Sequence, residues 1–199
     1  MLEIIISVCL GIGLSASAGF RIFVPLLLLS IAGYFEWIPL NEDWHWAGSI
    51  TAIIVLAAAS MFELVAYLIP YVDNLLDTIS IPLATVAGTL VMFTVLGDVD
   101  PIYSWTLAII AGGGTAASIA TTTSAARATS TTVTAGMANP LISVMEAIVS
   151  FFLSLLSLIA PIIAVIAVVL TLLGMRKLYR FMFRRSSLSR KRNNHQTLQ

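Results

Sequence analysis

Charge is scarce in this 199-residue chain: only 10% of the residues are Asp, Glu, Lys or Arg, against about 25% in soluble domains. Hydrophobic residues make up 59% of the chain, and its mean hydropathy is +0.99. This composition excludes an ordinary soluble globular protein, a disordered chain and a coiled coil. We therefore expect a membrane protein whose first partner is the lipid bilayer.

Cysteine and histidine are almost absent. The single Cys9 lies in an apolar run, which excludes an intrachain disulfide framework and a thiolate metal cluster within one chain. The two histidines, His45 and His195, lack partners at metal-ligand spacing. The signature motifs of serine hydrolases, P-loop NTPases and zinc peptidases are missing too. We therefore expect no enzymatic activity, no resident metal and no cofactor.

Long uncharged runs are the dominant feature that is present. Most of them reach the roughly 20 residues with which an α-helix crosses the hydrocarbon core of a bilayer. Because five such runs leave little sequence for a soluble domain, we predict an all-α fold. We expect this fold to be a polytopic transmembrane helical bundle of about five spans, with one or two kinked or re-entrant segments. The runs are residues 4–20, 44–62, 78–97, 101–126 and 147–175.

The charges are distributed unevenly, although the formal net charge is zero. Eight of the ten Lys and Arg residues lie in 176–199, and all ten acidic residues precede that segment. A basic segment directly after the last apolar run is typical of a cytoplasmic end. We predict a transmembrane domain over 1–175 and a basic cytoplasmic tail over 176–199, in the cytoplasmic (inner) membrane. No nucleic-acid partner is expected.

The first apolar segment, 2–34, is too long for one simple span. Gly11, Ser15 and Gly19 recur in it every four residues, a pattern of close helix packing in lipid. We expect either one kinked helix or two half-helices broken near 15–19. The side of the membrane on which the chain begins therefore stays open.

The last apolar segment, 141–174, is also long. A straight helix of this length would measure about 51 Å, more than the bilayer core. Pro161 predicts a kink or a break there. The first half of the segment is then either partly interfacial or re-entrant.

Between these segments lies a stretch of small residues, in which 24 of the 28 residues of 111–138 are Gly, Ala, Ser or Thr. Small side chains let neighbouring backbones approach closely, so we expect this helix at the centre of the bundle. The hydroxyls of 121–134 either hydrate a pore or bond back to carbonyls of the preceding turn, the commoner arrangement.

Four ionisable residues within or beside the apolar runs are the main functional signal. A charged side chain at mid-bilayer costs roughly 2.5–3.5 kcal/mol on insertion scales, so such groups pair or face water. We interpret them as a polar core that binds or transports a small solute or ion. The alternative is a structural or assembly protein in which two ion pairs only lock helices together. The four residues are Arg21, Arg127, Glu63 and Glu146.

In the functional interpretation, Arg21 and Arg127 select or gate a small anion or ion, because a guanidinium suits carboxylate and phosphate. Glu63 and Glu146 are their counter-ions. A homodimer with a shared pathway and a lipid-handling protein are further possibilities. Polar lining is assigned to Ser130 and Asn139.

A short acidic segment offers a possible cation site. Asp73 and Asp77 are four residues apart and share one helical face. With Asn74 and Glu63 they could supply oxygen ligands to a hard cation. The alternative is a solvated acidic cap at the membrane edge.

Five motifs, in order, resemble a bacterial membrane family known as domain of unknown function 4126. The resemblance covers about residues 11–174 and implies a polytopic membrane protein without an established activity. The chain departs from the family pattern at Tyr67 and Leu68, which replace an Asp-Lys pair, and it lacks a Lys in 119–126. The motifs are GFRIFVP (19–25), ELVAYLIPYVDNLLD (63–77), GGG (112–114), RATST (127–131) and GMANPLISVME (136–146).

Overall fold

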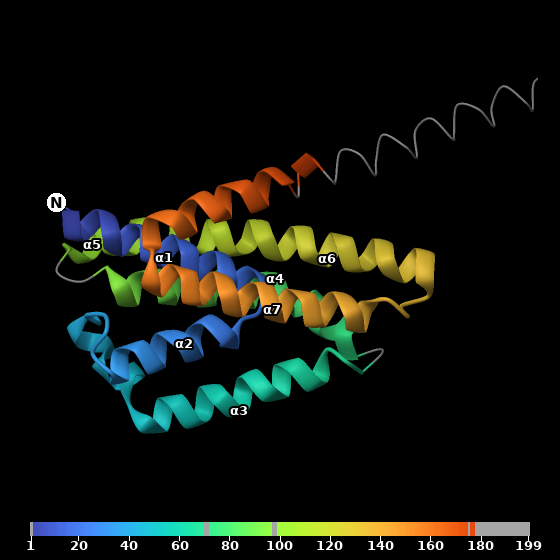
Figure 1. The fold of residues 1–199 in the computed structure, drawn as a ribbon, viewed down its shortest axis with the longest axis horizontal. Coiled ribbons are helices and arrows are strands. Elements are labelled where there is room, and N and C mark those ends of the chain that lie inside the picture. The colour runs from blue at the N-terminus through green and yellow to red at the C-terminus, as the bar shows by residue number, and fades with distance from the viewer. Residues whose placement is uncertain (1, 70–71, 97–98, 175, 178–199) are drawn as a thin grey trace, which may run out of the picture.

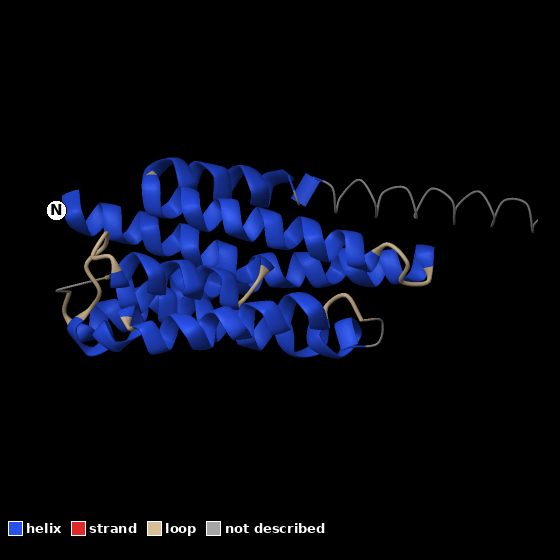
Figure 2. Ribbon diagram, turned by 60° about the horizontal axis from the view of Figure 1, so that its bottom comes forward, coloured by secondary structure: helices blue, strands red, loops and turns tan. Residues whose placement is uncertain are grey.

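The computed structural model describes residues 2–69, 72–96, 99–174 and 176–177. These residues form helices and connecting loops, without a strand among them (Figure 2). The predicted all-α fold is therefore confirmed. The predicted basic tail, 176–199, lies outside the described residues except for its first two positions.

Short connections join the helices of the described chain. Four of these helices are long and apolar enough to cross a membrane, or five if the bent pair of η1 and α3 forms one span. These are the helices of a multi-pass integral membrane protein, in agreement with the predicted number of spans. The elements are α1 (Leu2–Phe20), α2 (Phe23–Tyr34), the 3₁₀ helix η1 (Glu42–Gly48), α3 (Ile50–Ala66), α4 (Val72–Val95), α5 (Pro101–Leu107), the π-helix η2 (Ala108–Gly113), α6 (Gly114–Thr134), α7 (Asn139–Ile159) and a last helix, Pro161–Gly174.

The first apolar segment is broken into α1 and α2, and α2 runs back beside α1 (Figure 1). The N–H of Arg21 still donates to the Ser17 carbonyl at 3.0 Å, so α1 is regular up to that residue. A continued helix would drive the Pro25 ring into the carbonyl four residues before it. The break therefore falls at 21–22, after the small-residue stretch 15–19 in which the sequence suggested it.

The last apolar segment is also broken, as Pro161 predicted. α7 ends at Ile159, and the helix Pro161–Gly174 turns back along the bundle (Figure 1). Val168 of that helix packs with Leu153 of α7 and with Ala16 of α1. The chain thus uses a tight helical reversal near each end of the described bundle.

The helix at the centre of the bundle is α1, and the prediction that 111–138 lies there is wrong. Leu14 of α1 is completely buried, whereas Ser118 and Thr121 of α6 are exposed. Both hydroxyls donate to carbonyls four residues earlier at 2.7 Å. Because they satisfy their hydrogen bonds within the helix, this face of α6 needs no neighbour.

Small residues hold α1, α4, η2 and α6 together along what we call the small-residue seam: Ser15, Gly19, Gly88, Gly112 and Ala116. The Ser15 hydroxyl donates to the Gly88 carbonyl at 2.7 Å. A Cβ added to Gly112 would lie 2.5 Å from the Gly88 oxygen, and one added to Gly19 2.6 Å from the Ala116 oxygen. The backbones therefore touch directly, as the spacing of small residues in α1 predicted.

Candidate functional site

The reversal between α1 and α2 places a carboxylate at a helix N-terminus. Both oxygens of Glu63, which reaches over from α3, accept backbone hydrogen bonds, from Ile22 at 2.9 Å and from Phe23 at 3.1 Å. These N–H groups begin α2 and have no carbonyl partner of their own. Glu63 therefore caps α2, where the helix dipole favours negative charge.

Arg21 lies at the other side of the same reversal, at the C-terminal end of α1. Its side chain is only 1% exposed. The Nη2 atom donates to the Ser143 carbonyl of α7 at 2.8 Å and lies 3.5 Å from Oε2 of Glu146. Nε and Nη1 have no hydrogen-bond partner. A buried guanidinium with two unpaired nitrogens is costly, so its site is not optimised for stability alone.

Arg127 of α6 meets the same carboxylate. Its Nε donates to Oε1 of Glu146 at 3.2 Å, and its Nη2 contacts Oε2, so the pair is bidentate. Nη1 makes no hydrogen bond, and its ion-pair partner is Oδ1 of Asp77, 3.6 Å away. Glu146 therefore serves both arginines. The sequence suggested two ion pairs among the two arginines and two glutamates, but in the described chain both arginines pair with Glu146, and Glu63 caps α2 instead.

Tyr67 joins the two arginines. The guanidinium carbon of Arg21 lies 4.0 Å from the centre of its ring, and that of Arg127 lies 4.3 Å from it. Cation–π contacts of this kind are strongest where the groups are desolvated. Sequence reasoning missed Tyr67, although its position four residues after Glu63 places the two on one helical face.

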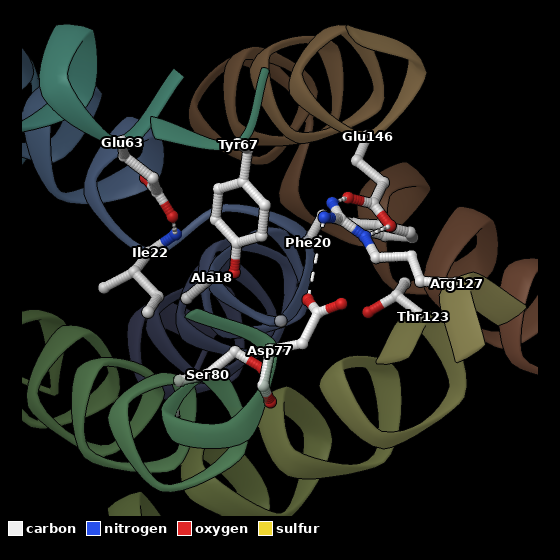
Figure 3. A pocket seen from close by; sticks show the side chains of 12 residues that line it. Ala18, Phe20, Ile22, Glu63, Tyr67, Asp77, Ser80, Thr123, Arg127 and Glu146 are labelled. Atoms are coloured by element: carbon white, nitrogen blue, oxygen red, sulfur yellow. Dashed lines mark hydrogen bonds and ion pairs between the residues drawn. The ribbon is translucent and has the colours of Figure 1, made fainter. Parts of the chain in front are cut away.

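A small cavity adjoins this group of charges, which we call the Arg–Glu cluster: Arg21, Glu63, Tyr67, Asp77, Arg127 and Glu146. The volume open to the centre of a water molecule is about 10 Å³, enough for about one water. Figure 3 shows Asp77 and Arg127 facing each other on the lining of this space, with Tyr67 and Ser80 beside them. We call this space the polar cavity. Its side-chain lining includes Glu63, Tyr67, Asp77, Ser80, Thr123, Arg127 and Glu146.

The predicted lining residues Ser130 and Asn139 lie in a different place. Asn139 is 1% exposed, and its Nδ2 donates to Oδ2 of Asp73 at 3.0 Å and to the Thr131 hydroxyl at 2.9 Å. It thereby ties the ends of α4, α6 and α7 together. The Ser130 hydroxyl is buried without a hydrogen-bond partner. Neither residue lines the polar cavity, so their predicted role stays a prediction.

The structure does not gather the predicted cation ligands at one point. Asp73 is bound to Asn139, Asp77 faces Arg127, and Asn74 is exposed. Within the described residues there is no group of three His, Cys, Asp or Glu side chains that could hold a metal ion. Asp77 therefore belongs to the Arg–Glu cluster.

Comparison with known proteins agrees with the resemblance seen in the motifs. The family model described as Domain of unknown function (DUF4126) matches residues 8–180, a range that contains the whole Arg–Glu cluster. No curated protein and no solved structure matches the chain.

Proposed function

Because the chain belongs to the DUF4126 family, a domain of unknown function, we propose from its own geometry that it binds a small solute or ion at the Arg–Glu cluster and carries it across the membrane. The observation that carries the proposal is a cavity beside the buried Arg21 and Arg127, lined by the carboxylate of Asp77 as well as by Arg127. Ionisable groups inside membrane proteins mark solute and ion pathways by default.

The balance of charge narrows the kind of solute. Two buried guanidinium groups stand against four carboxylates of Glu63, Asp73, Asp77 and Glu146, of which Asp77 is the most exposed. An excess of negative charge in an apolar bundle is costly unless a cation or proton neutralises it. The arrangement therefore favours a cation over the anion that the arginines alone suggested.

A structural role is the competing function, and specific contacts favour it as well. Glu63 caps α2, and Arg21 binds the Ser143 carbonyl, so the cluster connects α1, α2, α3 and α7. Such a lock would need neither the cavity nor the 3.6 Å gap between Arg127 and Asp77. These two features favour solute binding.

We further propose that the protein lies in the cytoplasmic membrane with its C-terminus in the cytoplasm. The support is the basic segment that follows the last apolar helix, Pro161–Gly174. The reversal of α1 into α2 returns the chain to the end of the bundle at which it began (Figure 1). Both ends of this hairpin would then face the outside.

Uptake into proteoliposomes tests the proposal. The probes are radioactive sodium, methylammonium, octylammonium and chloride, with empty liposomes as the background. We expect uptake of at least one cation and none of chloride. In Arg127→Lys, uptake should fall about ten-fold or more, because lysine keeps the charge but loses the planar fork that binds Glu146.

Arg176→Lys is the matched control, since Arg176 is exposed and lies outside the cluster. It should transport at the unmodified rate. Uptake of no cation by the unmodified protein, or equal uptake by folded Arg127→Lys, would rule the proposal out and leave the structural lock. Asp77→Asn serves as a second variant if Arg127→Lys does not fold.

A further inference from the structure

A second cavity opens beside the polar cavity and has the opposite character. The volume open to the centre of a water molecule is about 80 Å³, and its walls come from α2, α3 and α4 and from the residues next to them. We call it the apolar cavity. It shares Ile22, Glu63, Tyr67 and Ser80 with the polar cavity. The other residues that line it are Phe23, Phe62, Ala66, Leu76, Ile79 and Leu83.

The apolar cavity faces the lipid side of the bundle. Phe62 of α3 is 73% exposed, and Leu83 of α4 is 46% exposed. Helix α3 packs mainly against α2, which leaves the cavity between α3 and α4. An apolar molecule dissolved in the bilayer can therefore reach this cavity without crossing the bundle.

The polar cavity is lined by a carboxylate, that of Asp77, that accepts no hydrogen bond from the described chain. The other three carboxylates, of Glu63, Asp73 and Glu146, each accept hydrogen bonds. Within the described chain Asp77 has only the ion pair with Arg127, at 3.6 Å. That distance is too long for a hydrogen bond.

The size of the polar cavity limits what Asp77 can bind. Room for about one water is also room for one –NH₃⁺ group, which carries three donors. Figure 3 shows Asp77 and Tyr67 with oxygen atoms directed into this space. Ser80 also lines it, and its hydroxyl donates to the Asp77 carbonyl at 2.9 Å. A carboxylate, a phosphate or a quaternary ammonium group is larger than the space, and an anion would meet the carboxylate of Asp77.

We propose that the two cavities together bind an amphiphilic primary amine. Its ammonium group lies in the polar cavity on Asp77, and its hydrocarbon part lies in the apolar cavity between Phe62 and Leu83. The ammonium binds Asp77 from the side of the polar cavity, while Arg127 keeps its bidentate pair with Glu146 and stays at the edge of the cavity. This inference rests on the proposed function and names the class of its cation, a lipophilic amine that enters from the bilayer between α3 and α4.

Ligand-dependent thermal stability of the purified full-length protein in nanodiscs tests the proposal apart from transport. The ligands are octylammonium, octanol, octanoate and methylammonium. Together they distinguish the contribution of the ammonium charge from that of the hydrocarbon part of the ligand. We expect a saturable rise in Tm with octylammonium only. Asp77→Asn should weaken this response about ten-fold or more, since a hydrogen bond to a charged group is lost.

Leu83→Trp fills the apolar cavity and should abolish the response to octylammonium. Its matched control is Ile110→Trp on η2, because Ile110 is 70% exposed and lines neither cavity. The control should respond like the unmodified protein.

Three outcomes would overturn the inference. They are an equal response to octanol, an equal response to methylammonium, or an unchanged response in folded Leu83→Trp. A response to octanoate alone would instead indicate an anion site. If sodium uptake still depends on Arg127, the proposed function survives any of these results; if octylammonium binds but nothing is transported, only the transport proposal fails.

Discussion

The small-residue seam and the Arg–Glu cluster lie in the same bundle, but they bury polar groups in opposite ways. At the seam, the Ser15 hydroxyl donates to the Gly88 carbonyl at 2.7 Å, and Gly112 leaves no space for a Cβ. In the cluster, Arg21 and Arg127 keep nitrogens without a hydrogen bond, and a cavity is lined by both Arg127 and Asp77. At the seam the backbones are in contact and the buried hydroxyl is hydrogen-bonded. The cluster instead adjoins a cavity and contains nitrogens without a hydrogen bond.

This difference suggests a division of roles between the two regions. Close backbone packing stabilises helices in lipid, where the hydrophobic effect does not drive helices together. Buried ion pairs are weak evidence for stability, because apolar replacements are often equally stable. The ligand binding proposed above would account for the cluster. The following variants test the comparison from the largest expected effect to the smallest.

Glu146→Ala should have the largest effect of the three. It removes the carboxylate that serves both Arg21 and Arg127, and removing one partner of a buried ion pair costs about 3–5 kcal/mol. Loss of folded protein in detergent, followed by size exclusion and thermal unfolding, measures the effect. Glu36→Ala, at an exposed loop position, is the control and should unfold normally. Equal stability of the two variants would contradict the central position of Glu146.

Gly112→Ala should have the next largest effect, because it acts on the seam. The new Cβ would meet the Gly88 carbonyl of α4 at 2.5 Å, so η2 and α4 must separate. Overpacking of this kind costs about 1–3 kcal/mol. Thermal unfolding should show the loss, and any remaining folded protein should still give the proposed response to octylammonium.

Gly114→Ala is the matched control, two residues further along the same segment. A Cβ there meets nothing within 4 Å, so this variant should be neutral or more stable by about 0.5–1 kcal/mol. If both variants lose stability equally, contact across the seam does not explain the loss, because a Cβ at Gly114 meets no neighbour.

Glu63→Gln should have the smallest effect on stability. The amide keeps one acceptor for Ile22 or Phe23, but its NH₂ group faces the other N–H and its charge no longer matches the helix dipole. The loss of a helix cap costs about 1 kcal/mol. Thermal unfolding measures it, with Glu3→Gln, an exposed residue of α1, as the control. A loss as large as that of Glu146→Ala would show that the two glutamates are equivalent after all.

Part of the candidate site could be read from the sequence. Arg21, Glu63, Arg127 and Glu146 stand out because charges are rare in apolar runs, and the structure does bring them together. Tyr67 could not be singled out in this way, since tyrosines are common near membrane surfaces. The sequence placed Asp77 in a short acidic segment, either a cation site or a solvated cap, because nothing local shows that it faces Arg127, fifty residues later in the chain.

The prediction from sequence was wrong about the position of one helix. Small residues in 111–138 indicate that backbones can approach, but they do not say on how many sides. The hydroxyls of Ser118 and Thr121 donate hydrogen bonds to carbonyls within α6. Exposure of this face therefore leaves neither hydroxyl without a partner. The apolar helix α1 occupies the centre instead, since its own small residues lie in the seam while Leu10 and Leu14 fill the core.

Hydropathy and proline positions alone determined that this protein is a helical membrane protein, and Pro161 located one of its two reversals, because these properties depend only on neighbouring residues. Tertiary structure decided which carboxylate serves which arginine. Glu63 accepts hydrogen bonds at the start of α2, and Glu146 pairs with both guanidinium groups. Asp77 faces Arg127 beside the polar cavity. Such pairings follow from how the helices pack, and the packing is set by backbone contacts between segments far apart in the chain.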